Sequence, residues 1–214
     1  MKYLIFVLTF CACSASNSQN SSEKSSVVHS DPDLSGLSKA YFASGCFWCV
    51  EAVYESVKGV AESFSGYSGG HTKNPTYQSS NTGLTGHAEA VEIFYDPEIV
   101  SFETLVKVYY ASQDPTQANG QGPDRGSQYR SIIFYQNEEE RLIAEKYKAK
   151  VGEEYGQELP TEITQFEKFW MGEDYHQDFE KKNPNNGYVR AVSIPRLNRF
   201  KAKHPELLKE GLDH

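Results

Sequence analysis

Two cysteines three positions apart, Cys46 and Cys49, stand out as residues that could carry chemistry. They enclose two large aromatic residues, Phe47 and Trp48, at the predicted start of a helix. Free backbone N–H groups and the positive end of a helix dipole favour an anion there, so the pattern predicts a lowered pKa for the Cys46 thiol. Apolar rings beside a thiolate suit a small uncharged group such as a methyl. The motif therefore predicts thiol redox chemistry on an apolar substrate.

A strand and a helix are predicted on either side of this motif. The stretch 39–43 before it is strand-like, and Val50, Val53 and Val57 recur at helical spacing after it. The other predicted elements are strands at 88–95, 131–135 and 161–164, helices from Phe102 and at 138–150, and long polar loops at 65–86 and 118–126. Strands and helices do not alternate regularly as in βαβ units, so we predict a two-layer α+β domain.

Composition and charge limit the classes of function. The chain has 214 residues, enough for one domain with a sizeable core, and 38% of them are hydrophobic. The formal net charge of −8, without any Lys- or Arg-rich run, argues against a nucleic-acid partner. A zinc site at Cys46 and Cys49 lacks a second pair of ligands. We therefore expect neither a metal nor another cofactor.

The N-terminal residues have the pattern of an export signal. An apolar run at 3–10 is too short to span a bilayer as an ordinary helix, and Cys13 follows it as in a bacterial lipoprotein signal. The predicted divisions are a signal segment at 1–13, a disordered polar tether at 14–37 and a folded domain at 38–214. The protein is then exported to the periplasm, or anchored in the cell envelope by a lipid on Cys13. A simple cleaved signal ending near Ala15 or Ser16 is the alternative.

Export leaves Cys46 and Cys49 as the cysteines of the folded part. An even pair in an exported protein is often a structural disulfide. A bond across three positions, however, closes almost no loop and would constrain the unfolded chain little. We therefore interpret the pair as a redox couple.

Glu89 is the second residue suited to this chemistry. By period-2 alternation it shares a strand face with Val91 and Ile93. Burial on that face would favour the protonated carboxyl, which could then act as an acid. The alternative is that this face is exposed to solvent.

Three polar residues, Tyr77, Asp124 and Tyr129, lie in or beside the two long loops. A tyrosine hydroxyl can donate a hydrogen bond to a polar oxygen, and an aspartate can orient the hydroxyl. Taken singly, each has the alternative interpretation of an ordinary loop residue, just as Phe47 and Trp48 have that of core aromatics.

Several blocks of the chain resemble the peptide methionine sulfoxide reductase A family. The stretch 45–51 is similar to the active-site signature of that family. The other similar blocks follow in family order, within roughly residues 39–200, at 66–70, 74–77, 86–91, 124–131, 175–177 and 182–184. The resemblance implies a two-layer sandwich with a mixed sheet and a ferredoxin-like core, and a monomeric protein.

The same resemblance implies an enzyme that reduces methionine S-sulfoxide, free and in proteins, and so repairs oxidative damage. By this resemblance Cys46 is the nucleophile, and Phe47 and Trp48 hold the methyl group of the sulfoxide. The sulfoxide oxygen is held by Glu89, Tyr77 and Tyr129. Asp124 supports these three residues. Attack on the sulfur would leave a sulfenic acid on Cys46, which a nearby thiol can condense to a disulfide.

The chain departs from the family pattern at Cys49, where family members usually have glycine. Many members carry resolving cysteines near the C-terminus, whereas no cysteine follows Cys49 here. Cys49 is then the intramolecular candidate to resolve the sulfenic acid, and a thioredoxin-like electron donor would reduce the resulting disulfide. The alternative is direct reduction of the sulfenic acid by an outside thiol, with Cys49 as a small core residue.

Two other classes of function use the same motif. A general thiol-disulfide oxidoreductase would need Cys46 and Cys49 but not Glu89, Tyr77 or Tyr129. A non-catalytic module would bind oxidised surface proteins through its aromatic residues and would keep its affinity when Cys46 is replaced by serine. Turnover of a sulfoxide substrate distinguishes both from the reductase.

Overall fold

The computed structural model describes Met1 and residues 33–211. The predicted signal segment and most of the predicted tether therefore lie outside the described residues. The first strand begins at Ser38. Within the described part, no helix has the length and apolar character needed to cross a membrane.

A six-stranded sheet in the order β7-β6-β1-β3-β2-β8 forms the centre of the domain. Its strands are β1 (Ser38–Ser44), β2 (Val60–Ser68), β3 (Ala88–Tyr95), β6 (Ser131–Tyr135), β7 (Glu162–Gln165) and β8 (Phe169–Met171). Neighbouring strands are antiparallel except β6 and β7, which run parallel. The sheet is therefore mixed, and the prediction of an α+β fold is confirmed.

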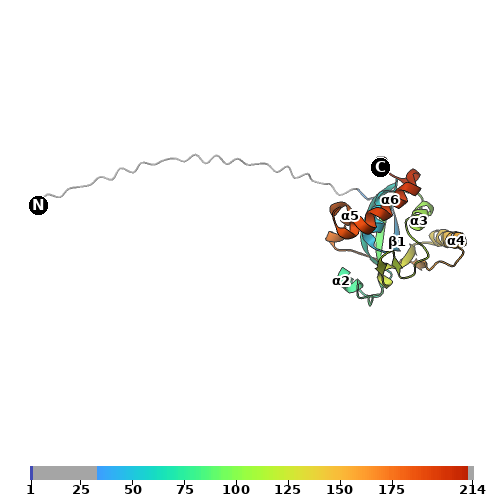
Figure 1. Ribbon diagram of the computed structural model, residues 1–214, viewed down its shortest axis with the longest axis horizontal. Coiled ribbons are helices and arrows are strands. Elements are labelled where there is room, and N and C mark those ends of the chain that lie inside the picture. The colour runs from blue at the N-terminus through green and yellow to red at the C-terminus, as the bar shows by residue number, and fades with distance from the viewer. Residues whose placement is uncertain (2–32, 212–214) are drawn as a thin grey trace. The chain divides into compact units, whose positions relative to one another are not determined.

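Six α-helices accompany the sheet, counted over the described residues, and Figure 1 shows α6 crossing in front of β1. They are α1 (Phe47–Glu55), α2 (Tyr77–Ser80), α3 (Phe102–Ala111), α4 (Glu138–Tyr155), α5 (Phe179–Lys182) and α6 (Ile194–Lys203). Shorter elements connect them: the hairpin of β4 (Gly120–Gln121) and β5 (Asp124–Arg125), and the turns η1 (Ser127–Tyr129), η2 (Asp174–His176) and η3 (Val189–Ser193).

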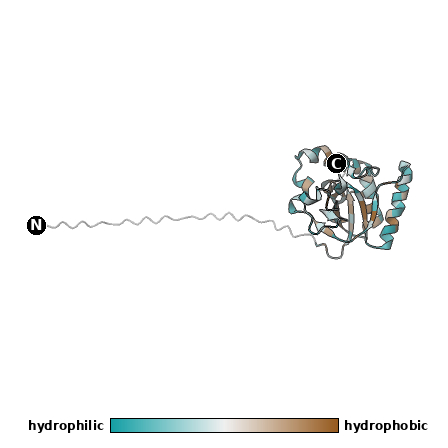
Figure 2. Cartoon of the chain, turned by 90° about the horizontal axis from the view of Figure 1, so that it is seen from below, coloured by the Kyte–Doolittle hydropathy of each residue, from teal (hydrophilic) through white to brown (hydrophobic). Residues whose placement is uncertain are grey.

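The two faces of the sheet bury two different clusters, as the alternation in β1 shows. Ala40 and Phe42 belong to the larger cluster, and the Phe42 ring lies 5.3 Å from that of Tyr54 in α1. Tyr41 points to the opposite face, where Phe166 stacks on it at 3.7 Å. Figure 2 accordingly shows the hydrophobic colour concentrated on the central strands. The helices thus cover one face, and the segment between β7 and β8 covers part of the other.

The strand β2 corrects the prediction of a loop from residue 65 onward. It continues to Ser68 and pairs with β3 over that whole stretch. A Cβ at Gly66 would lie 2.3 Å from the Trp170 carbonyl oxygen of β8, so the glycine permits a close approach that a larger residue would prevent. The sequence did not predict this part of the strand, because glycine and serine lack the β-branched or aromatic side chains that are enriched in strands.

The helix α4 is longer than the predicted range 138–150. Asn137 caps its start by accepting from the Glu140 amide at 2.9 Å, as predicted. The helix ends at Tyr155 because Gly156 takes the left-handed conformation, with φ of 66°. The lysines near residue 150 therefore lie inside the helix rather than at its end.

Candidate active site

Cys46 and Cys49 lie one helical turn apart at the start of α1. Cys46 is the N-cap residue, and its carbonyl oxygen accepts from the Cys49 amide at 3.1 Å. Both side chains are free thiols and are almost fully buried. Because residues three apart share one face of a helix, the two thiols are neighbours.

The pKa values of the two thiols differ from the expectation for Cys46. Burial raises the pKa of the Cys46 thiol, and its hydrogen bond with Cys49 raises it further. The same hydrogen bond lowers the pKa of Cys49 to about 6, and the charge of Arg196 also lowers it. The first negative charge of the pair therefore resides on Cys49. The expected lowering at Cys46 was wrong, because burial of the thiol outweighs its position at the N-terminus of α1, where the first free amide donates to Glu89.

Glu89 points from β3 to the N-terminus of α1. Val91 and Ile93 share its face of the strand and belong to the larger core cluster. The Glu89 side chain is only 2% exposed, and its Oε2 accepts from the Phe47 amide at 3.0 Å. Burial raises the pKa of Glu89 to about 8, and the charge of Asp124 contributes. The carboxyl is therefore largely protonated at neutral pH and has a proton to give.

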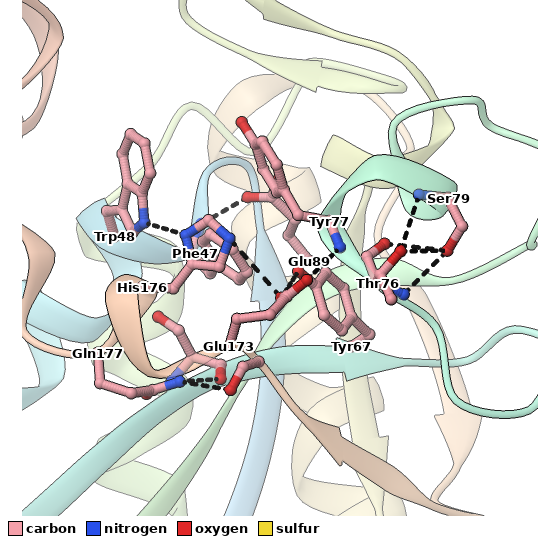
Figure 3. A network of polar contacts seen from close by, with 12 residues as sticks. Phe47, Trp48, Tyr67, Thr76, Tyr77, Ser79, Glu89, Glu173, His176 and Gln177 are labelled. Carbon is pink, nitrogen blue, oxygen red and sulfur yellow. Dashed lines mark hydrogen bonds and ion pairs between the residues drawn. The ribbon is translucent and has the colours of Figure 1, made fainter.

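Phe47 and Trp48 leave the helix in different directions, yet their rings remain 6.2 Å apart. Phe47 is fully buried, and Trp48, only partly buried, stacks on Phe179 at 3.7 Å. The ring of Tyr77 stacks on Phe47 at 6.3 Å. Figure 3 shows Phe47, Trp48 and Tyr77 close to the buried Glu89. The aromatic wall expected from the sequence is thus present beside the thiols.

A polar network that the sequence did not reveal holds two of these aromatic residues. The Trp48 indole N–H donates to His176 Nδ1 at 3.0 Å, as Figure 3 shows. Glu173 accepts from the Tyr77 amide at 2.9 Å and from the Tyr67 hydroxyl at 2.8 Å. Burial lowers the pKa of His176, so its ring is neutral and carries its hydrogen on Nε2. The only signal for Tyr67 and His176 was their place in a family-like block, and Glu173 had no such signal.

Tyr77 and Tyr129 reach the site from α2 and η1, and both are half-buried. Burial raises the pKa of Tyr129, and the charges of Glu89, Tyr77 and Cys46 raise it further. Burial, followed by the charges of Glu89 and Cys46, likewise raises the pKa of Tyr77. Both hydroxyls therefore keep their protons and can donate hydrogen bonds toward a ligand beside Cys46.

Asp124 makes its hydrogen bond with Tyr188, a residue that the sequence did not single out. The Tyr188 hydroxyl donates to Asp124 Oδ2 at 2.6 Å and lies 3.7 Å from Cys49 Sγ. Asp124 is therefore linked to the second thiol rather than hydrogen-bonded to Tyr77 or Tyr129. No local pattern could identify Tyr188, which is 139 positions from Cys49.

One cluster of described residues has the geometry to hold a metal. Ligand atoms of Glu51, Glu55 and Asp178 lie within 4.8 Å of one another. The ammonium of Lys181 lies 3.8 Å from Glu55 and 3.1 Å from Asp178, so a cation of the chain already balances these acids. Neither thiol belongs to this cluster.

Comparisons with known proteins identify the family to which this arrangement belongs. The profile of the family described as "Peptide methionine sulfoxide reductase" matches residues 38–208, which include every element of the sheet. The chain belongs to the peptide methionine sulfoxide reductase family. It is accordingly an enzyme that reduces methionine sulfoxide.

Individual relatives of this reductase family agree with the assignment. "Peptide methionine sulfoxide reductase MsrA 1" of Rhodopirellula baltica is 47% identical over 81% of this chain and 91% of its own length. "Peptide methionine sulfoxide reductase MsrA" of Saccharolobus solfataricus is 46% identical over 79% and 96%. Among solved structures, "Methionine sulfoxide reductase A of Corynebacterium diphtheriae" superposes with a TM-score of 0.65 and 36% identity, covering 71% of this chain and 77% of that one.

Proposed function

We propose that this reductase acts on the S epimer of methionine sulfoxide, free and in proteins, with Cys46 as the nucleophile. The observation that carries the proposal is a protonated, buried Glu89 hydrogen-bonded to the residue that follows Cys46. A sulfoxide sulfur is open to attack by a thiol only when its oxygen is neutralised, and a buried acid supplies that proton. The aromatic wall of Phe47 and Trp48 supports an apolar methyl beside the thiol.

In the first step Cys46 Sγ attacks the sulfoxide sulfur. Glu89 gives its proton to the sulfoxide oxygen, which Tyr77 and Tyr129 also bind, and the thiol proton of Cys46 returns to Glu89. The S–O bond of the substrate breaks as the protonated oxygen moves to Cys46 Sγ, the bond between the two sulfurs breaks, and methionine leaves with Cys46 as a sulfenic acid. The sulfur of Cys46 is oxidised from a thiol to a sulfenic acid while the substrate sulfur is reduced from a sulfoxide to a thioether. This step therefore needs no other electron donor.

In the second step Cys49 resolves the sulfenic acid. Its sulfur attacks that of Cys46, the S–S bond forms, and the hydroxyl leaves as water with the Cys49 proton. The one-turn separation of the two buried residues supports this closure. A thioredoxin-like dithiol donor then returns the disulfide to two thiols by thiol–disulfide exchange.

A single-turnover assay with counted thiols tests the proposed function. The reduced enzyme is mixed with an S-sulfoxide peptide without any reductant, and methionine and free thiols are measured. We expect one methionine formed and two thiols lost per enzyme, and no reaction with the R epimer. Reduction of insulin disulfides without any methionine would instead establish a general thiol-disulfide oxidoreductase.

We propose that β1, α1, β2, β3, α3 and β6 form a ferredoxin-like core. A βαββαβ sequence of elements with an antiparallel sheet in the order β6-β1-β3-β2 supports this proposal. The strands β7 and β8 then extend that core at its two edges.

We also propose that the protein is exported and anchored in the bacterial cell envelope by a lipid on Cys13. The apolar run at 3–10 and the polar stretch after Cys13 support this proposal. We expect the mature chain purified from cells to start at Cys13 with added acyl mass. A mass spectrum of a chain beginning at Met1, or near Ala15 without acyl groups, would contradict the anchor.

A further inference from the structure

Arg196 of α6 is a buried cation without a carboxylate beside it. Its side chain is 6% exposed, and its three hydrogen bonds go to the Ser112 carbonyl at 2.7 Å, the Ser44 carbonyl at 2.9 Å and the Ser44 hydroxyl at 3.0 Å. These acceptors are neutral, and no carboxylate of the described residues lies within 4.0 Å of the guanidinium. A guanidinium keeps its charge when buried, and a buried charge without a counter-charge is costly.

The guanidinium contacts the backbone that leads from β1 into the two thiols. Ser44 ends β1 and is followed by Gly45 and Cys46, and a Cβ at Gly45 would lie 3.6 Å from Arg196 Nη1. The turn η3 connects Tyr188, whose hydroxyl lies 3.7 Å from Cys49 Sγ, directly to α6. The positive charge is therefore fixed beside the turn that leads into the cysteine pair, where it acts on Cys49.

The groups that face Cys49 come from its own helix and from other parts of the fold. They are Cys46 at the N-cap of α1, Glu89 in β3, Asp124 in β5 with the hydroxyl of Tyr188, and Ser193 with Arg196 around the start of α6. Glu89 is largely protonated at neutral pH, and the Asp124 carboxyl accepts from the Tyr188 hydroxyl and is also acted on by the charge of Arg196. Arg196 is the cation of this set, and a thiolate on Cys49 is an anion without another fixed counter-charge.

We propose that Arg196 is a positioning residue for the resolving step, in which it is the counter-charge of the Cys49 thiolate. The inference rests on the proposed function, where Cys49 attacks the sulfenic acid of Cys46. In that step the thiolate forms the S–S bond, the S–O bond of Cys46 breaks, and the departing hydroxide takes up the proton that Cys49 released. Arg196 thus favours the form of Cys49 that can attack.

The first test measures the ionisation of Cys49 alone. In a Cys46→Ser background, the ultraviolet absorbance of the remaining thiolate is titrated against pH with Arg196 intact, Arg196→Lys, Arg196→Gln and Arg196→Met. We expect Arg196→Gln and Arg196→Met to leave about tenfold less thiolate at pH 6, because a neutral side chain removes the counter-charge. Arg196→Lys keeps a positive charge and is expected to retain most of the thiolate.

Matched controls separate charge from folding. Arg199→Gln changes an exposed arginine of the same helix and is expected to leave the titration unchanged. Arg196→Met fills a similar volume without a new polar group, so it replaces Arg196→Gln if that variant does not fold by circular dichroism. An unchanged titration of Cys49 in whichever neutral variant folds would overturn the proposal.

The second test follows the resolving step in the enzyme with both cysteines. After one turnover with an S-sulfoxide peptide, a dione probe captures the sulfenic acid at increasing times. We expect Arg196→Gln to form methionine within about twofold of the wild-type rate but to keep its sulfenic acid about tenfold longer. Lifetimes equal to those of the wild type would count against Arg196. If the wild type forms no methionine, the proposed function is refuted. The titration of Cys49 needs no turnover, so it still tests the role of Arg196 in that case.

Discussion

Replacing Glu89 by alanine is expected to slow methionine formation by about two to four orders of magnitude, the range for loss of a general acid. The variant has no buried carboxyl to protonate the sulfoxide oxygen, and the Phe47 amide loses its acceptor at 3.0 Å. The measurement is the single-turnover rate with an S-sulfoxide peptide. Circular dichroism of the variant checks that α1 and the sheet are intact.

Glu89→Gln is the matched control for this loss. Its amide can still accept from Phe47 and donate to the sulfoxide oxygen, so we expect a far smaller loss than in Glu89→Ala. The pKa of Glu89 is raised to about 8 by burial, so the wild-type rate should fall as pH rises through about 8. The glutamine variant should lack that alkaline decline. Equal losses in the two variants would contradict a hydrogen-bonding role for Glu89.

Stability should depend on pH through the same group. The folded protein keeps the Glu89 proton up to a pKa of about 8, whereas the unfolded chain releases it near the ordinary value of 4.5. The contribution of Glu89 to the free energy of unfolding is therefore fully present below the lower value and is lost as pH rises through the upper one. Glu89→Gln should flatten this part of the stability profile.

Replacing Cys49 by serine is expected to separate the two halves of the reaction. One methionine should still form per enzyme, since Cys46 and Glu89 are unchanged. Steady-state turnover with a dithiol protein reductant should fall at least about tenfold, because no Cys46–Cys49 disulfide is available for exchange. Methionine formed in the presence and absence of the reductant gives both quantities.

The competing hypothesis predicts a different outcome for the same variant. If an outside thiol reduces the sulfenic acid directly, Cys49→Ser keeps its turnover with every reductant. A small monothiol compound is the control, because it can attack the sulfenic acid of Cys46 without a partner cysteine. Undiminished turnover with the dithiol protein would refute the resolving role of Cys49.

Local periodicity allowed part of this site to be predicted from the sequence. The spacing of Cys46 and Cys49 sets them one helical turn apart, and alternation along β3 aligns Glu89 with Val91 and Ile93. Both inferences need only the repeat of a helix or strand, which the chain fixes over a few residues. The blocks that resemble a known family were needed to assign Tyr77, Asp124 and Tyr129 to the same site.

Tertiary packing decided what local spacing cannot specify. Tyr188 reaches Cys49 across 139 positions, and His176 accepts from Trp48 across 128. The lower pKa belongs to Cys49 rather than Cys46 because the hydrogen bond between the two thiols lowers the pKa of the first and raises that of the second, while burial and Arg196 also act on them differently. Such contacts arise when β1, α1 and α6 pack together, and burial then sets the charge of each group. The sequence by itself determined that the site carries thiol redox chemistry. Only the packed structure decided which of the two thiols carries the negative charge.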